Sequence, residues 1–161
     1  MTISEADIWR ELDDVKDPEI PAISVVELGI VRRVEVIAGK VNVTMTPTFS
    51  GCPAIEVMKR EVESAVRRLG ADDVGVEMVL YPPWTSEWIS ESGREKLRDF
   101  GLAPPPRHQG NVAEVAFFDL AECPYCGSTN TSLRNAFGPT LCRMTWYCHD
   151  CRDAFEQFKA L

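Results

Sequence analysis

Histidine is nearly absent from this sequence: only His108 and His149 occur, and neither lies in the first two thirds of the chain. A cysteine hydrolase requires a base, usually histidine, beside its nucleophile. The sequence also lacks the carboxylate–histidine helix pairs of di-iron centres, a G-x-G-x-x-G fingerprint and a P-loop. These absences argue against a histidine-assisted thiol enzyme, a di-iron oxygenase and a nucleotide-binding enzyme.

Long hydrophobic runs and an excess of positive charge are absent as well. No stretch approaches the ~18 apolar residues of a membrane-spanning helix, and the N-terminus lacks the basic and apolar regions of a signal peptide. The formal net charge is -8 at pH 7, whereas nucleic-acid binders usually present a basic surface. We therefore expect a cytoplasmic protein that binds neither a membrane nor nucleic acid.

The sequence does contain the pattern of a small α+β fold. Hydrophobic residues make up 45% of the chain, which is enough for a packed core. Ser4 is a candidate N-cap, and Gly70 suits the C-terminal cap of a helix that Pro53 begins. The hydrophobic spacing predicts, in chain order, a helix over 4–16, a hairpin of strands 29–37 and 40–46, a helix over 53–69, a strand over 74–81 and a helix over 85–101.

A proline-rich segment over 102–111 is expected to be a linker between two domains. We assign residues 1–104 to a small α/β domain with the element order α-β-β-α-β-α. Residues 111–161 are assigned to a β-rich module that begins with a predicted strand over 112–120. A module of about 50 residues lies near the size at which a core alone struggles to fold, so we expect a metal to hold it together.

Two C-x-x-C pairs, Cys123 with Cys126 and Cys148 with Cys151, are separated by 21 residues. Such pairs can supply four thiolates to a tetrahedral Zn²⁺ ion, and the strand-like segment between them is typical of a zinc ribbon. The spacing predicts a structural zinc site. A rubredoxin-like iron site accepts the same four thiolates and remains an alternative.

Details around these pairs qualify the zinc interpretation. Gly127 suits a tight turn after the first pair, whereas Arg152 stands where the second pair would prefer glycine. Cys142 is interpreted as a buried strand residue, with a rival metal ligand as the alternative. His149 falls inside the second pair, where its ring is expected to face away from the metal. A redox dithiol is the other interpretation, but a module so small and rich in loops favours a metal.

Cys52 stands alone in the stretch TMTPTFSGCPAI (44–55). Because Pro53 is expected in the first helical turn, Cys52 should lie at or beside the N-cap, where backbone N–H groups favour a thiolate. Such a sulfur can be a nucleophile, a redox sensor or a metal ligand, and an inert cap residue is the alternative. Without a base, transient ligation fits better than catalysis. Since Fe–S clusters usually take four thiolates, a second chain or another molecule would complete the ligand set.

Several motifs taken together resemble a known family: DPEIP (17–21), VVELGIV (25–31), TPTFSGCPA (46–54) and the strand over 74–81. They are similar to the small α/β iron–sulfur assembly-factor family that includes SufT. The segment YPPWTSEWI (81–89) and the C-terminal cysteine pairs resemble the branch of that family found in phenylacetyl-CoA epoxidase systems. The resemblance spans nearly the whole chain. It implies an accessory protein without catalytic activity of its own, which assembles or delivers metal centres.

The resemblance also assigns residues and partners. It implies that Cys52 ligates a transient Fe–S cluster or iron, and that Asp17, Glu19, Thr46 and Thr48 support the loop around it. The implied partners are the oxygenase or reductase subunits of the epoxidase in aerobic phenylacetate catabolism, and a homodimer is a further possibility. From the residues alone, turn chemistry explains the two acidic residues and strand ends explain the two threonines equally well.

Trp84 and Trp88 lie four residues apart after a Pro-Pro pair. They are interpreted as anchors of the following helix on the sheet, with a partner contact as the alternative, because tryptophan is enriched at interface hot spots. Two alternatives to the accessory function also stay open at this point. One is a rubredoxin-like electron-transfer component of the same oxygenase, and the other is a thiol enzyme that uses Cys52.

Overall fold

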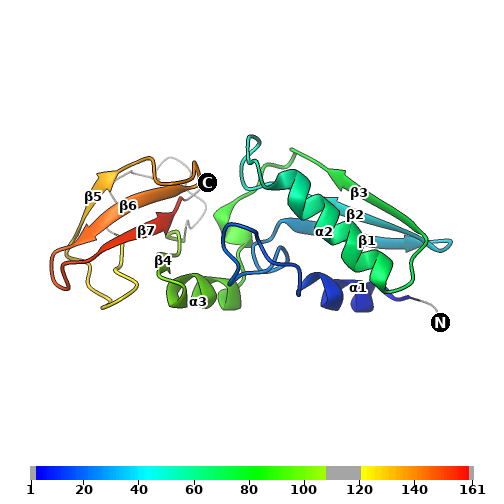
Figure 1. The fold of residues 1–161 in the computed structure, drawn as a ribbon, viewed down its shortest axis with the longest axis horizontal. Helices are drawn as coiled ribbons and strands as arrows, with labels where there is room; N and C mark the ends of the chain where they lie inside the picture. Colours follow the sequence, from blue (N-terminus) through cyan, green and yellow to red (C-terminus); the bar gives the residue numbers. More distant parts are fainter. Residues whose placement is uncertain (1–2, 108–120, 160–161) are drawn as a thin grey trace. The chain divides into compact units, whose positions relative to one another are not determined.

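The computed structural model describes residues 3–107 and 121–159 (Figure 1). They form two compact units. The first holds the described residues up to Trp84 together with Trp88–Gly93, and the second holds Thr85–Glu87 together with the described residues from Arg94 onward. The first unit combines helices with a three-stranded sheet and the second contains a four-stranded sheet, so the predicted α+β class is confirmed.

The first unit opens with helix α1 (Glu5–Leu12), which confirms the helix predicted over 4–16 in a shorter form. Ser4 is its N-cap, as the sequence predicted. The Ser4 hydroxyl accepts the backbone N–H of Asp7, and the Asp7 carboxylate accepts the backbone N–H of Ser4, which completes a capping box. Ile8 and Leu12 are buried on one face of the helix.

Strands β1 (Val31–Ile37) and β2 (Lys40–Met45) form the predicted antiparallel hairpin. Its turn residues, Ala38 and Gly39, have φ angles of 51° and 83°, as a two-residue turn that matches the strand twist requires. Strand β3 (Asp73–Met78) pairs with β2 in parallel, so the sheet order is β1-β2-β3. A parallel pair needs a crossover connection, and helix α2 supplies it.

Helix α2 (Ile55–Arg68) lies across the sheet (Figure 1). Its stripe of Met58, Val62, Ala65 and Val66 is buried, as are the alternating strand residues Val41, Val43 and Met45. Gly70 has a φ of 94° just after the helix, which confirms its predicted role at the C-terminal end. The predicted start at Pro53 is wrong: Ala54 is the N-cap and Ile55 is the first helical residue.

The helix predicted over 85–101 is wrong as a single element. Ser86–Trp88 form a short 3₁₀ turn, and α3 begins at Glu91 and ends at Asp99. The break lies at Ser90, whose side chain accepts the backbone N–H of Gly93 and whose own N–H donates to the Glu27 carbonyl. Ser90 thus caps α3 while its backbone is held by a residue distant in sequence, which a local pattern does not reveal.

The second unit contains β4 (Leu102–Ala103), β5 (Thr131–Asn135), β6 (Arg143–Cys148) and β7 (Ala154–Phe158) in the order β4-β7-β6-β5. Its buried cluster includes Ala103, Ala121, Trp146 and Phe155. Residues 102–103 belong to this sheet rather than to a linker, because β4 pairs with β7. The strand predicted over 112–120 lies outside the described residues. The domain limits 1–104 and 111–161 stay a prediction.

Arg94 fixes the start of the second unit. Its side chain is only 7% exposed. One guanidinium nitrogen donates to the Pro105 carbonyl at 2.6 Å and the other to the Ser86 carbonyl at 2.9 Å. The buried charge therefore joins the 3₁₀ turn to the proline-rich segment on the other side of α3.

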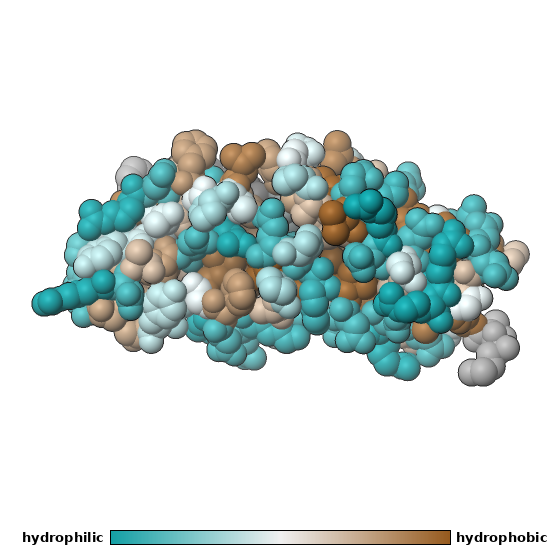
Figure 2. All heavy atoms as spheres, in the orientation of Figure 1, coloured by the Kyte–Doolittle hydropathy of each residue, from teal (hydrophilic) through white to brown (hydrophobic). Residues whose placement is uncertain are grey.

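Hydrophilic residues cover most of the face seen in Figure 2, with hydrophobic residues in separate patches. Within the described ranges, no helix is long and apolar enough to cross a membrane.

Candidate metal centre and thiol loop

The structure brings the sulfur atoms of Cys123, Cys126, Cys148 and Cys151 within 4.8 Å of one another. Two close approaches cross between the two C-x-x-C pairs. Cys123 Sγ lies 3.7 Å from Cys151 Sγ, and Cys126 Sγ lies 3.6 Å from Cys148 Sγ. Four thiolates at ~2.3 Å from a tetrahedral metal ion would be about 3.8 Å apart. The four sulfurs therefore fit a tetrahedral metal ion.

Two matching turns position these sulfurs. The N–H of Cys123 donates to the Ser128 carbonyl, and the N–H of Cys148 donates to the Asp153 carbonyl, each at 2.9 Å and five residues further along. The fourth residue after each of these cysteines has a positive φ: 73° at Gly127 and 64° at Arg152. The second turn therefore adopts the same backbone as the first, although its left-handed residue is arginine, for which that conformation is strained.

The thiols differ in acidity before any metal binds. The backbone N–H of Cys151, helped by that of Asp150, lowers the pKa of Cys148 to about 7. A backbone hydrogen bond from Asp153 acts to lower the pKa of Cys151, but burial and the neighbouring thiols raise it to about 12. The site therefore does not hold four thiolates together without a cation, and binding a divalent metal there releases protons.

Asp150 links the two turns and was not anticipated from the sequence. Its carboxylate accepts the Ser128 hydroxyl and, at 2.8 Å, the Asn130 side-chain N–H. The hydrogen bond from Ser128 is the main reason that the pKa of Asp150 lies below its ordinary value. The sequence signal that could have indicated this link is the group of hydrogen-bonding residues that follows Cys126 in CGSTN (126–130).

Cys142 and His149 stand apart from the four-cysteine cluster among the described residues. The His149 Nε2 atom lies 3.0 Å from the Ser132 hydroxyl, and its ring meets the Tyr147 ring edge-on. Cys142 is half-buried just before β6, with its sulfur 3.1 Å from the Thr140 hydroxyl. Both side chains therefore contact residues outside the four-cysteine site.

Cys52 lies in the loop between β2 and α2 and is half-buried. Its N–H donates to the Phe49 carbonyl at 3.1 Å, and its carbonyl accepts the N–H of Ile55 at 3.3 Å. Because the N-cap is Ala54, Cys52 precedes the cap by two residues. The predicted position at or beside the N-cap is therefore wrong. The tight turn explains Gly51, where an added Cβ would lie 2.8 Å from the Phe49 ring.

The predicted supporting residues lie in two different loops. Thr46 begins the Cys52 loop; its backbone N–H donates to the Ile30 carbonyl at 2.8 Å, and its buried hydroxyl has no hydrogen-bond partner in the described structure. Thr48 is half-buried in the same loop. Asp17 lies after α1, where its Oδ1 atom accepts the N–H groups of Glu19 and Ile20. Asp17 therefore forms the turn that its residue type predicted.

The two tryptophans pack within the first unit. Trp84 is 5% exposed, and its indole N–H donates to the Leu28 carbonyl at 2.9 Å. The guanidinium carbon of Arg32 lies over the Trp88 ring, 3.5 Å from its centroid. Gly29, with a φ of 70°, approaches Trp88 so closely that an added Cβ would lie 2.6 Å from its backbone oxygen. These contacts hold the segment after β3 against the loop before β1 and against Arg32 of β1. Anchoring of the following helix on the sheet and a partner contact both stay predictions.

Glu27 is a further residue that sequence reasoning missed. It is buried, and its two carboxylate oxygens accept the N–H of Ser24 and the hydroxyl of Ser92. With the Ser90-to-Glu27 backbone hydrogen bond, it attaches the segment before α3 to the loop before β1. A carboxylate inside the apolar run VVELGIV was the available signal.

Comparison with known proteins agrees with this two-part architecture. Residues 109–159 match the family described as "PaaD zinc beta ribbon domain", and residues 5–78 match the family described as "Iron-sulfur cluster assembly protein". The chain is 36% identical over 155 residues to an Escherichia coli (strain K12) protein named as a subunit of a "Putative 1,2-phenylacetyl-CoA epoxidase", covering 96% of this chain and 92% of that protein. The chain belongs to the PaaD family.

Other similar proteins match a little more than half of this chain. A Porphyromonas gingivalis "Fe-S protein maturation auxiliary factor" is 38% identical over 96 residues, covering 58% of this chain and 90% of that protein. The solved structure "Conserved Hypothetical Protein TM0487 from Thermotoga maritima" is 33% identical with a TM-score of 0.53. The match covers 60% of this chain and 98% of that one. The solved structure of a domain of unknown function from Bacillus anthracis is 28% identical with a TM-score of 0.54. The match covers 58% of this chain and 90% of that one.

These comparisons define what this PaaD-family chain contains. It joins an iron–sulfur assembly domain to a zinc-ribbon domain, and its ribbon holds a four-cysteine site suited to a metal ion. Cys52 lies within the part that matches the assembly family.

Proposed function

We propose that this chain is an accessory protein that assembles or delivers iron or an Fe–S cluster for the multicomponent phenylacetyl-CoA epoxidase of aerobic phenylacetate catabolism. One observation carries the proposal: an iron–sulfur assembly domain and a PaaD ribbon are joined in a chain that is 36% identical, over almost its full length, to a protein named as a subunit of that epoxidase. The chain itself contributes no catalytic step in this proposal.

Cys52 is the proposed ligand for the cluster or iron, which is the cargo of the protein. Its loop follows β2 directly, and Thr46 fixes the start of this loop through its bond to Ile30. One thiolate binds a cluster only loosely, because clusters usually take four. Such a site therefore requires ligands from a client or a second copy, and it suits transfer better than storage. Thr48, Asp17 and Glu19 shape the surrounding loops.

The four-cysteine site of the second unit is proposed to bind a structural Zn²⁺ ion. The bound ion supplies charge neutralisation and a cross-link between the two turns. In a small sheet this cross-link replaces hydrophobic core. The module is then free to act as a docking surface for the oxygenase or reductase subunits, which are the proposed partners.

Anaerobic reconstitution with iron and sulfide tests the role of Cys52. The wild-type protein should gain cluster absorption that is lost in Cys52→Ala and kept in Cys142→Ala. Cys142 is the matched control because it is also half-buried and lies outside the four-cysteine cluster. Zinc should first be loaded into the ribbon, so that iron cannot occupy that site. Equal cluster absorption in wild type and Cys52→Ala would contradict the proposal.

A rubredoxin-like electron-transfer role is the second candidate. The sulfur separations of 3.6 and 3.7 Å suit a tetrathiolate iron ion as well as zinc. Metal analysis of anaerobically purified protein separates the two functions. We expect one zinc ion per chain and no iron at the four cysteines, whereas iron with a reversible redox signal would favour electron transfer.

A further inference from the structure

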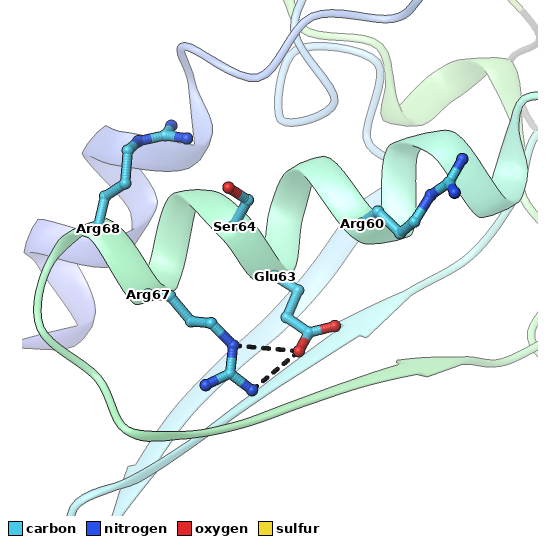
Figure 3. A pocket seen from close by; sticks show the side chains of 5 residues that line it. All are labelled: Arg60, Glu63, Ser64, Arg67 and Arg68. Carbon is cyan, nitrogen blue, oxygen red and sulfur yellow. Dashed lines mark hydrogen bonds and ion pairs between the residues drawn. The ribbon is translucent and has the colours of Figure 1, made fainter.

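The outward side of α2 carries arginines around a shallow hollow. Arg60, Ser64 and Arg68 follow one another at intervals of four residues, so they form one row along the helix. Glu63 and Arg67 form the neighbouring row (Figure 3). These five residues line a hollow of about 430 Å³. The short Ser64 side chain between two long ones leaves the space.

Two of the arginines are held in place by neighbours. Arg67 donates to the Glu63 carboxylate at 2.9 and 3.1 Å and to the Asp72 carbonyl at 3.0 Å. Arg68 donates to the Glu11 carboxylate through two nitrogens, at 3.0 and 3.1 Å. A guanidinium has five N–H donors, so each of these side chains keeps donors for a ligand. Both are about half exposed, at 48% and 55%.

Arg60 differs from the other two arginines. In the part of the chain that the structure describes, it forms no hydrogen bond and no ion pair, and its side chain is exposed. The three arginines around the hollow face two carboxylates, Glu63 and Glu11, so the charge of Arg60 is left over among the described residues, in a chain whose net charge is -8. This local excess of positive charge is opposite in sign to the protein as a whole.

We propose that this arginine row is a docking surface for an acidic segment of a partner protein, independent of Cys52. Charge complementarity identifies the partner: guanidinium groups bind carboxylates through paired N–H donors. Arg60 and Arg68 are eight residues apart, which is about 12 Å along a helix. An acidic helix with carboxylates two turns apart matches this spacing, and the hollow at Ser64 accepts the side chain between them.

A nucleic acid fits this surface less well. Glu56, Glu61 and Glu63 lie on the same helix, and a duplex presents one phosphate charge for about every 1.7 Å of its length. Phosphates would therefore face these glutamates as well as the arginines. A protein can place carboxylates opposite the arginines alone.

The test uses the full-length, metal-loaded protein and a fluorescent synthetic helical peptide with glutamates eight residues apart. We expect Arg60→Gln together with Arg68→Gln to slow association at low salt by about fivefold or more and to weaken its salt dependence. The matched control is Arg10→Gln together with Arg33→Gln, which removes the same charge from exposed, ion-paired arginines elsewhere in the unit. The control should change the rate by less than about twofold.

Further variants separate the docking role from effects on folding. Arg60→Gln alone removes no intramolecular partner and should still slow association. Arg60→Lys keeps the positive charge and should retain most of the wild-type association rate. A peptide with glutamine in place of glutamate should not bind. The proposal is overturned if the glutamate peptide does not bind, or if both double variants lose binding equally. It is also overturned if a short DNA duplex binds these arginines more tightly than the peptide does.

Discussion

The sulfur atoms of Cys126 and Cys148 lie 3.6 Å apart although 21 residues separate the two cysteines in the chain. The hairpin of β5 and β6 produces this approach, because its antiparallel register returns the chain to the first turn: Thr131 pairs with Cys148. The same register brings Asp150 to Ser128 and Asn130. Metal binding and the fold of this sheet are therefore expected to be coupled.

Replacing Cys126 by serine should abolish high-affinity metal binding and unfold the second unit. The remaining three sulfurs cannot complete a tetrahedral site, and binding energy in such modules is folding energy. Hydrogen exchange is the measurement: β5–β7 should lose protection, while β1–β3 should keep it. A chelator should act on the wild type in the same way, and Cys142→Ser is the control. Loss of protection in both sheets would show that the first unit does not fold independently of the second.

In the two turns at the metal site, removing the side chain at Arg152 and adding one at Gly127 should have opposite effects on stability. Arg152, with a φ of 64°, should gain stability on replacement by glycine, by about 0.5–1 kcal/mol, because relief of the left-handed strain exceeds the added freedom of the unfolded chain. Gly127→Ala should lose about 1 kcal/mol. Urea unfolding of protein saturated with metal measures both. A loss of stability in Arg152→Gly would mean that the arginine side chain contributes more than its backbone strain costs.

Gly29→Ala should destabilise the first unit far more than Gly39→Ala. Both glycines have positive φ, at 70° and 83°, but an added Cβ at Gly29 would lie 2.6 Å from the Trp88 backbone oxygen, whereas nothing lies within 4 Å at Gly39. We expect a cost of about 3 kcal/mol or more at Gly29 and about 1 kcal/mol at Gly39. Denaturant unfolding provides the comparison. Equal costs would show that the segment around Trp88 moves aside freely.

The capping box of α1 predicts a pH-dependent contribution to stability. The hydrogen bond from the Ser4 hydroxyl is the main reason that the folded-state pKa of Asp7 lies below its ordinary value of 3.8. A depressed carboxyl pKa stabilises the fold above the unfolded pKa, and this stabilisation is lost as pH falls through the folded pKa. Wild type should therefore be more stable than Asp7→Asn at neutral pH, and the difference should shrink below about pH 4. Ser4→Ala should weaken this pH dependence, and a constant difference would contradict the assignment.

The sequence predicted those elements whose signals are local. The N-cap at Ser4, the hairpin turn before Lys40 and the glycine after α2 each depend on residues within one or two turns of the chain. Four cysteines in two C-x-x-C pairs likewise predicted a single metal site, because few other arrangements satisfy that spacing.

The errors arose where distant residues decide the local structure. Ser90 interrupts the helix predicted over 85–101 because its N–H binds the Glu27 carbonyl. Leu102 and Ala103 directly precede the three prolines that predicted a linker, but they pair with β7. The predicted start of α2 lies two residues too early, since proline suits several positions near a helix start.

The amino-acid sequence by itself determined the class of the fold, the composition of the metal site and the family, because periodicity, ligand type and motif identity are properties of the chain. Only the tertiary structure decided which sulfurs approach each other across the site, where Cys52 lies relative to α2, and how Trp84, Trp88 and Glu27 fix the loop before β1. It also decided that Arg60, Arg67 and Arg68 surround one hollow. These facts depend on the register of paired strands and the packing of side chains, which join residues that no local pattern connects.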